Sequence, residues 1–184
     1  MQAIPMMQKP KRRAARIACA AALLLSAASA AHAADSNLVS TQKLRWQTAQ
    51  ALAAEAVRVC ASEGYSVTAT VVDPSGHQQA VIKGDTVPLQ SLSVSYRKAY
   101  TAYAYGLAFD KDSTSALIAA KVTGPLDGAV LATEPEVLFI PGGVTLRTAN
   151  RTAIGGLGVS GAPGGDKDEA CAQAAVDRFK GDFH

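Results

Sequence analysis

The residues in this chain that could do chemistry lie mainly between His77 and Tyr105. The neutral imidazole of His77 could bind a metal, although a solvated strand residue is the plainer interpretation. Val94, Lys98, Thr101 and Tyr105 recur at helical spacing, which puts a cation, a hydroxyl and a phenol on one helix face. Such a face could line a pocket for a flat apolar ligand that carries carboxylates. A subunit contact or an ordinary helix flank would show the same spacing.

Two catalytic motifs are suggested by the glycines near the C-terminus, and both fail on context. Gly156, Gly158 and Gly161 spell G-x-G-x-x-G, but a dinucleotide site needs a helix and then a second parallel strand with an acid about 20 residues on. The segment Gly158-Val-Ser-Gly-Ala162 around Ser160 resembles the nucleophile elbow G-x-S-x-G, but it has alanine in place of the last glycine. The glycines therefore indicate backbone geometry, and no nucleophile or acid–base set is visible.

Two cysteines, Cys60 and Cys171, follow the leader-like N-terminal segment. Each lies on the apolar stripe of an expected helix, so the pair could form a disulfide or remain as two free core thiols. A zinc site is improbable because His77 and His184 are the only histidines available beside them. Asp166 and Glu169 resemble an acidic iron-binding pair, but this spacing is also typical of a helix N-cap, which we favour.

Residues 1–33 have the pattern of a cleaved secretory signal peptide. A basic start precedes an apolar run from Ile17 to Ala30 and an A-x-A site that ends at Ala33. The apolar run is shorter than the about 20 residues of a membrane-spanning helix. Five of the 18 Lys and Arg residues lie in this segment and no acids do, which leaves 13 basic against 15 acidic residues. A periplasmic or secreted protein is expected, and nucleic acid is an unexpected partner.

The remaining residues, 34–184, suit a single domain with one core. On the helix that follows Pro88, one apolar stripe is expected to face that core: Leu89, Leu92, Tyr96, Ala99 or Tyr100, and Tyr103. The pattern predicts helices at 38–62, after Pro88, at 113–120 with Asp112 or Ser113 as N-cap, and from Asp166 onward. It predicts strands at 65–72, 77–82, 136–140, 143–147 and 153–160. The first two strands are expected to form a hairpin through a type I turn at Asp73-Pro-Ser-Gly76. The strands at 136–140 and 143–147 are expected to form a second hairpin, after a loop around Gly124, Pro125 and Gly128.

Several motifs resemble one known family. They are Arg97-Lys-Ala-Tyr-Thr-Ala102, Pro141-Gly-Gly143, Ile154-Gly-Gly-Leu-Gly-Val-Ser-Gly161 and Asp166-Lys-Asp-Glu-Ala-Cys-Ala172. In this order they are similar to the haem-binding or haem-degrading domain family, whose members include GlcG, HbpS and the C-terminal half of PduO. The resemblance covers the chain from Leu38 onward.

This resemblance implies an α/β (α+β) fold of the profilin-like sandwich type, with a mainly antiparallel five-stranded sheet covered by the N- and C-terminal helices. It also implies haem as cofactor and a homo-oligomer. A threonine is implicated in haem coordination in HbpS-like proteins, which makes Thr101 the first candidate iron ligand and His77 the second. Lys98, Tyr105 and Tyr100 complete the candidate haem contacts.

The expected function is an exported haem- or tetrapyrrole-binding protein for sequestration, delivery or redox sensing. One alternative is an enzyme that degrades haem or acts on a small molecule of the glycolate or diol-utilisation type. The residues themselves favour binding over catalysis, although haem breakdown would take its chemistry from the cofactor. A ligand-free accessory subunit is the other alternative. No transmembrane span is expected after the signal is removed.

Overall fold

The computed structural model describes residues 37–131 and 133–183, so the expected signal segment at 1–33 lies outside them. Residues 41–184 form one compact unit. None of the helices in the described part is both long and apolar enough to span a membrane.

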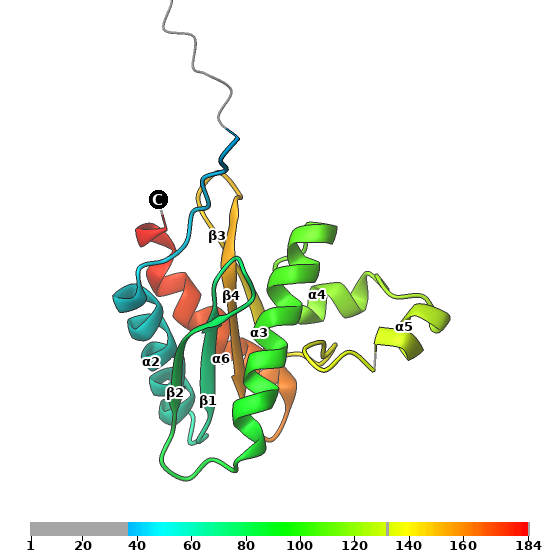
Figure 1. The fold of residues 1–184 in the computed structure, drawn as a ribbon. Coiled ribbons are helices and arrows are strands. Elements are labelled where there is room, and N and C mark those ends of the chain that lie inside the picture. The colour runs from blue at the N-terminus through cyan, green and yellow to red at the C-terminus, as the bar shows by residue number, and fades with distance from the viewer. Residues whose placement is uncertain (1–36, 132, 184) are drawn as a thin grey trace, which may run out of the picture. The chain divides into compact units, whose positions relative to one another are not determined.

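An antiparallel sheet of four strands lies at the centre of the described residues, in the order β2-β1-β4-β3. Figure 1 shows α2 and α6 on one side of it and α3 and α4 on the other. The strands are β1 (Thr68–Val72), β2 (Gln78–Lys83), β3 (Gly143–Arg147) and β4 (Ala153–Ser160), and the helices are α2 (Trp46–Ser62), α3 (Gln90–Phe109), α4 (Thr114–Ala119), α5 (Pro125–Leu131), α6 (Gly165–Phe179) and the 3-10 turn η1 (Lys180–Asp182).

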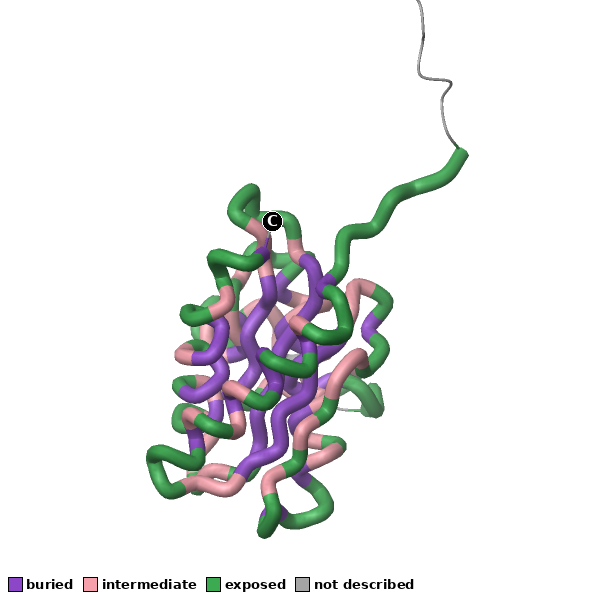
Figure 2. Tube along the Cα trace, turned by 90° about the vertical axis from the view of Figure 1, so that its left-hand side faces the viewer, coloured by how far each residue is buried: buried purple, intermediate pink, exposed green. Residues whose placement is uncertain are grey.

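The apolar core lies between the sheet and the pair α2 and α6. Leu52 from α2, Ala175 from α6 and Leu157 from β4 have no exposed surface there. Figure 2 shows the buried strands running through the centre of the domain. Cys60 and Cys171 form a disulfide across this layer, with Cα atoms 5.4 Å apart. The two open alternatives for these cysteines are thus resolved in favour of the bond.

The opposite face of the sheet packs against α3 through small and polar side chains. The hydroxyls of Thr68 and Ser91 are 2.7 Å apart, and those of Thr70 and Ser95 are 2.8 Å apart. A side chain at Gly158 would collide with the α3 backbone at Ser95. The lack of a side chain at Gly158 therefore allows α3 to lie almost directly on β4.

This close approach limits what the packed face of α3 can carry, and the predicted stripe was right only in part. Ala99 is fully buried as expected, but it is joined by Ser91 and Ser95, while the predicted core residue Leu89 is 77% exposed at the N-cap. The large side chains of the stripe were the wrong guide because backbone contact with the sheet leaves little room for them.

Among the described residues, one expected helix begins late and one expected strand does not form. Helix 38–62 begins only at Trp46, because the preceding backbone is held extended on the hairpin, where the Gln79 amide donates to Leu44 O at 2.6 Å. The segment 136–140 is not a strand, because α3 side chains bind its backbone at Val137 and Leu138. The expected five-stranded sheet is thus four-stranded, and β3 pairs with β4 instead.

Other local predictions were mixed. The strands at 143–147 and 153–160 are confirmed, as are the β1–β2 hairpin and Ser113 as the N-cap of α4. The loop expected around Pro125 is the helix α5. The expected cap of α6 is wrong, since Gly164 is the N-cap and no side chain caps it. The α+β class, with helices covering an antiparallel sheet, is confirmed.

Candidate functional site

Lys98, predicted to bind a carboxylate of a ligand, is bound to a carboxylate of the protein instead. Its side chain is 3% exposed, and Nζ lies 2.6 Å from Asp168 Oδ2. It also donates to Val159 O at 3.1 Å. Burial raises the pKa of Asp168, while the Lys98 ammonium acts in the opposite direction. Lys98 therefore joins α3 to α6 inside the domain.

Thr101, the first candidate iron ligand, has no exposed surface. Its Oγ1 accepts a hydrogen bond from the backbone N–H of Leu138 at 2.7 Å. His77, the second candidate, is exposed at the β1–β2 turn, where its carbonyl accepts from Asp73 N at 2.9 Å. Tyr100 is half-buried near that turn, with its ring 6.3 Å from the ring of Tyr96. The structure does not bring these predicted contacts together in one cavity.

Tyr105 is the predicted residue that does reach a hollow. Its ring meets the Phe139 ring edge to face, with centroids 4.9 Å apart, and stacks on the Phe109 ring at 6.2 Å. Burial is the first cause that raises the pKa of Tyr105, with contributions from Tyr100 and Glu134. The phenol is therefore protonated at neutral pH.

One face of α3 holds the segment that carries Phe139. Arg97 Nη2 donates to Val137 O at 2.7 Å, Thr101 accepts from Leu138 N at 2.7 Å, and Tyr105 packs on Phe139. The three α3 residues are spaced four apart, so they line one side of the helix. The segment 137–139 is fixed along that side, which places the Phe139 ring at the hollow.

Two open hollows, of about 350 and 630 Å³, have Thr123 in common; Tyr105 lines the smaller and Phe139 the larger. Because these two rings are in contact, we treat the hollows together and call them the aromatic hollow. Its lining comes from α3, α4, α5 and the intervening loops: Tyr105, Phe109, Leu117, Ile118, Lys121, Val122, Thr123, Gly124, Gly128, Val130, Leu131 and Phe139.

Most of this lining is apolar, and part of it faces solvent. Val130 is 64% exposed, Phe109 44% and Ile118 41%. Among its described lining residues, the polar side chains are those of Tyr105, Lys121 and Thr123. An exposed apolar surface with a few polar groups is typical of a ligand or partner site. The hollow can thus take a flat apolar molecule and offer a cation and two hydroxyls at its edge.

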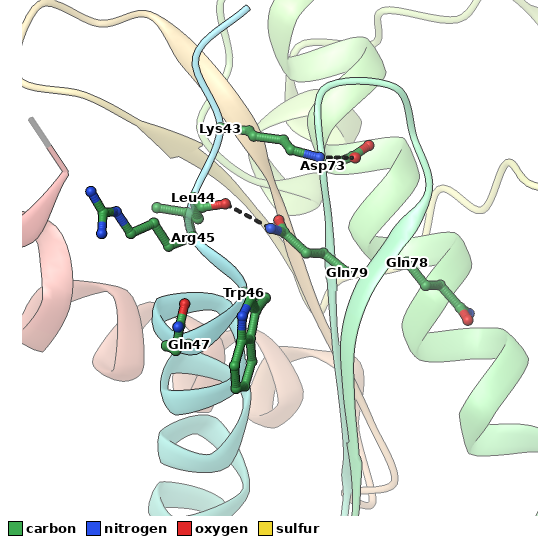
Figure 3. Close-up of a pocket in the computed structure, with 8 residues that line it drawn as sticks. All are labelled: Lys43, Leu44, Arg45, Trp46, Gln47, Asp73, Gln78 and Gln79. Atoms are coloured by element: carbon green, nitrogen blue, oxygen red, sulfur yellow. Dashed lines mark hydrogen bonds and ion pairs between the residues drawn. The ribbon is translucent and has the colours of Figure 1, made fainter.

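A second hollow lies beside the N-terminal end of α2, and Figure 3 shows the side chains that line it. Lys43 Nζ is 3.3 Å from Asp73 Oδ2, and the Gln79 amide donates to Leu44 O. The ring of Trp46 is largely exposed beside them. These two contacts anchor the chain before α2 to the hairpin.

Glu169, one of the acidic pair at the start of α6, binds groups of the protein itself. Glu169 accepts hydrogen bonds from Gly142 N at 3.0 Å, Ser115 N at 3.1 Å and Thr114 Oγ1 at 2.9 Å. Burial acts to raise the pKa of Glu169, but these hydrogen bonds lower it overall. No cluster of three or more His, Cys, Asp or Glu that could hold a metal occurs within residues 37–131 and 133–183.

Sequence reasoning missed most of the aromatic hollow. It identified Tyr105, but Phe109, Phe139, Lys121 and Thr123 were not among its candidates. The segment after Gly124 was expected to be a loop and 136–140 a strand. The only sequence signal for this site is the presence of the aromatic residues themselves. They form a site only when α5 and the segment 137–139 are placed beside α3.

Known proteins with this fold include members of a haem-related family. Residues 44–177 match a family model described as haem degrading protein HbpS-like. Among curated protein sequences none matches. A double mutant of HbpS from Streptomyces reticuli is 31% identical, with a TM-score of 0.67 over 83% of this chain and 98% of that one. A complex of PduOC with haem is 25% identical, with a TM-score of 0.61 over 74% of this chain and 94% of that one.

The fold is also shared by the protein ORFY of Klebsiella pneumoniae. That structure is 24% identical, with a TM-score of 0.64 over 78% of this chain and 95% of that one.

Proposed function

The chain belongs to the HbpS-like family of haem-degrading proteins, and from this premise we propose that it is an exported protein that binds haem or a related tetrapyrrole in the aromatic hollow. The observation that carries this proposal is the edge-to-face pair of Tyr105 and Phe139 at an open apolar hollow. The haem complex of the related PduOC supports the class of ligand.

The lining residues fit a macrocycle with acidic substituents. The rings of Tyr105, Phe109 and Phe139 offer flat apolar surface for the porphyrin. Lys121 supplies a cation for a propionate, as a flexible point charge. Tyr105 and Thr123 place side-chain oxygens on the described lining of the hollow, so these protein groups could approach the iron. When bound, haem supplies the redox chemistry of its iron.

The proposed role is sequestration or delivery of haem outside the cytoplasm. Support comes from the basic and apolar pattern of residues 1–33. The alternative of haem breakdown is supported by the name of the family. The lining residues that the structure describes include a protonated phenol but no carboxylate or imidazole, which favours binding.

We also propose that subunits self-associate through the outward side of α3. Leu89 is 77% exposed and Leu107 55% exposed on this helix. Large apolar side chains left in water on one helix are typical of an interaction surface. Sedimentation of the mature protein tests this: a mass above that of one subunit is expected, and replacement of both leucines by glutamine should reduce it.

The test of the main proposal is a haem titration of residues 34–184, followed in the Soret region. A saturable shift at a fixed haem-to-subunit ratio is expected. Phe139→Leu and Tyr105→Leu should each weaken binding about tenfold or more, since each removes ring contact worth about 1 kcal/mol besides apolar area. Trp46→Leu removes an exposed ring outside the hollow and should leave affinity unchanged.

Three results would be decisive. The absence of a spectral shift would refute the haem proposal. Equal haem affinity in all variants would show that haem binds outside the aromatic hollow. Bleaching of the bound haem with ascorbate and oxygen, with iron released, would make the protein an enzyme.

A further inference from the structure

The disulfide between Cys60 and Cys171 is covered unequally on its two sides. Cys60 has no exposed surface, whereas Cys171 is 3% exposed. An open groove of about 340 Å³ reaches Cys171 but not Cys60. We call it the α2–α6 groove, and its lining includes Val59, Glu63, Tyr65, Lys167, Ala170 and Cys171.

A cation lies on the wall of this groove. Lys167 stands one helical turn before Cys171 on α6. Its Nζ lies over the Tyr65 ring, 5.1 Å from the ring centroid. Glu63 supplies an opposing carboxylate on the α2 side. The groove thus has an apolar floor beside Cys171 and a positive charge held at its edge by an aromatic ring.

We propose that the α2–α6 groove admits small thiols to the disulfide and directs their attack to the sulfur of Cys171. The incoming thiolate bonds to Sγ of Cys171, and the bond between the two cysteines breaks. The electron pair leaves on Sγ of Cys60, which takes up a proton to become a buried thiol. The product is a mixed disulfide at Cys171, and no further oxidant or reductant is needed.

The stability of the leaving thiolate favours attack on Cys60, whereas access from solvent favours attack on Cys171. Cys60 lies in the last turn of α2, where the helix dipole disfavours a thiolate, so it is the poorer leaving group. Attack on Cys60 would release the better leaving group, near Lys167. A sulfur without exposed surface cannot be approached by a solute, however, so access decides the outcome.

The first experiment maps the mixed disulfide. The oxidised mature protein is exposed briefly to 3-mercaptopropionate at concentrations that leave its circular dichroism unchanged. It is then quenched in acid, alkylated and digested for mass spectrometry. The thiol is expected on the Cys171 peptide and the alkyl group on Cys60. The reverse assignment, an equal mixture, or no exchange before the protein unfolds would each overturn the proposal.

A pair of single-cysteine variants tests the same access without a leaving group. In C60S the remaining Cys171 should react with an aromatic disulfide reagent at least about tenfold faster than Cys60 does in C171S. Both variants are compared again in denaturant, where the two rates should converge. Equal rates in the folded proteins would contradict the proposed access from one side.

The role of Lys167 is tested by charge. In K167Q, exchange with anionic 3-mercaptopropionate should slow about threefold relative to uncharged 2-mercaptoethanol, because a local attractive charge is lost. K83Q, which removes an exposed lysine from β2, serves as the control and should keep the wild-type ratio. An unchanged ratio in K167Q would remove Lys167 from the proposed site.

Discussion

The Thr101 hydroxyl accepts a 2.7 Å hydrogen bond from the backbone N–H of Leu138 and has no exposed surface. This bond holds the segment that ends at Phe139. Thr101 therefore affects the aromatic hollow indirectly, by holding in place the segment that carries Phe139. The same residue was predicted to bind iron directly, and the two roles have different experimental signatures.

Thr101→Val separates these roles. Loss of the acceptor leaves the Leu138 N–H without its partner, which should destabilise the fold by about 1–3 kcal/mol. Thr101→Ser keeps the hydroxyl and should retain most of the stability. Urea unfolding measures the stability, and the Soret maximum of the bound haem reports the iron ligands. If T101V shifted that maximum and left unfolding unchanged, direct coordination would be the better description.

Lys121→Gln tests the proposed partner of the haem carboxylates. Removal of the cation should weaken haem binding about threefold to tenfold, as expected for one partly exposed charge pair. Binding of the dimethyl ester of haem, which lacks both carboxylates, should not change. Lys83→Gln is the matched control outside the hollow. An equal loss for haem and its ester would mean that Lys121 contributes contact area and not charge.

Gly158→Ala tests the close packing of α3 on β4. The added methyl group would meet the α3 backbone at Ser95 and Ala99, and such overpacking should cost about 1–3 kcal/mol. Gly181→Ala is the control, because a methyl group added there would have no atom within 4 Å of it. That variant should change thermal stability little. A Gly158→Ala protein with wild-type stability would show that α3 can move away from the sheet without cost.

Glu169 should account for part of the loss of folding stability at acid pH. Its pKa is lowered below the ordinary 4.5 in the folded protein, so it adds stability above that pH. This stability is lost as pH falls through the folded pKa. Glu169→Gln should therefore flatten the dependence of unfolding free energy on pH below about 4.5. The exposed Glu63→Gln variant should keep the wild-type slope, and an unchanged slope in E169Q would count against this role.

The disulfide should contribute several kcal/mol to the stability of the domain. The two cysteines are 111 residues apart, and closing a loop of that length lowers the entropy of the unfolded chain by an amount worth about 4–5 kcal/mol. Replacing both cysteines by alanine should lower the melting temperature, and a reductant should then have no further effect. A variant as stable as the oxidised protein would refute this.

Elements with local signals could be predicted from the sequence. An apolar run interrupted by glycines predicted β4 at its observed bounds. The turn before His77 was predictable from its residue types. In the structure the Asp73 side chain accepts from Ser75 N at 2.9 Å, and Gly76 adopts a φ of +79°. The two cysteines were placed on core-facing stripes, and their bond followed from the packing of α2 against α6.

The composition of the packed face of α3 and the place of the hollow depend on long-range contacts. Backbone contact with β4 at Ser95 and Ala99 admits only small residues there, and Leu89 lies exposed although its spacing indicated the core. Lys98 pairs with Asp168, 70 residues away, inside the domain. Phe139 meets Tyr105 because α3 side chains bind the backbone before it. Such long-range contacts leave no periodic trace in a sequence, because they join residues whose separation along the chain is arbitrary.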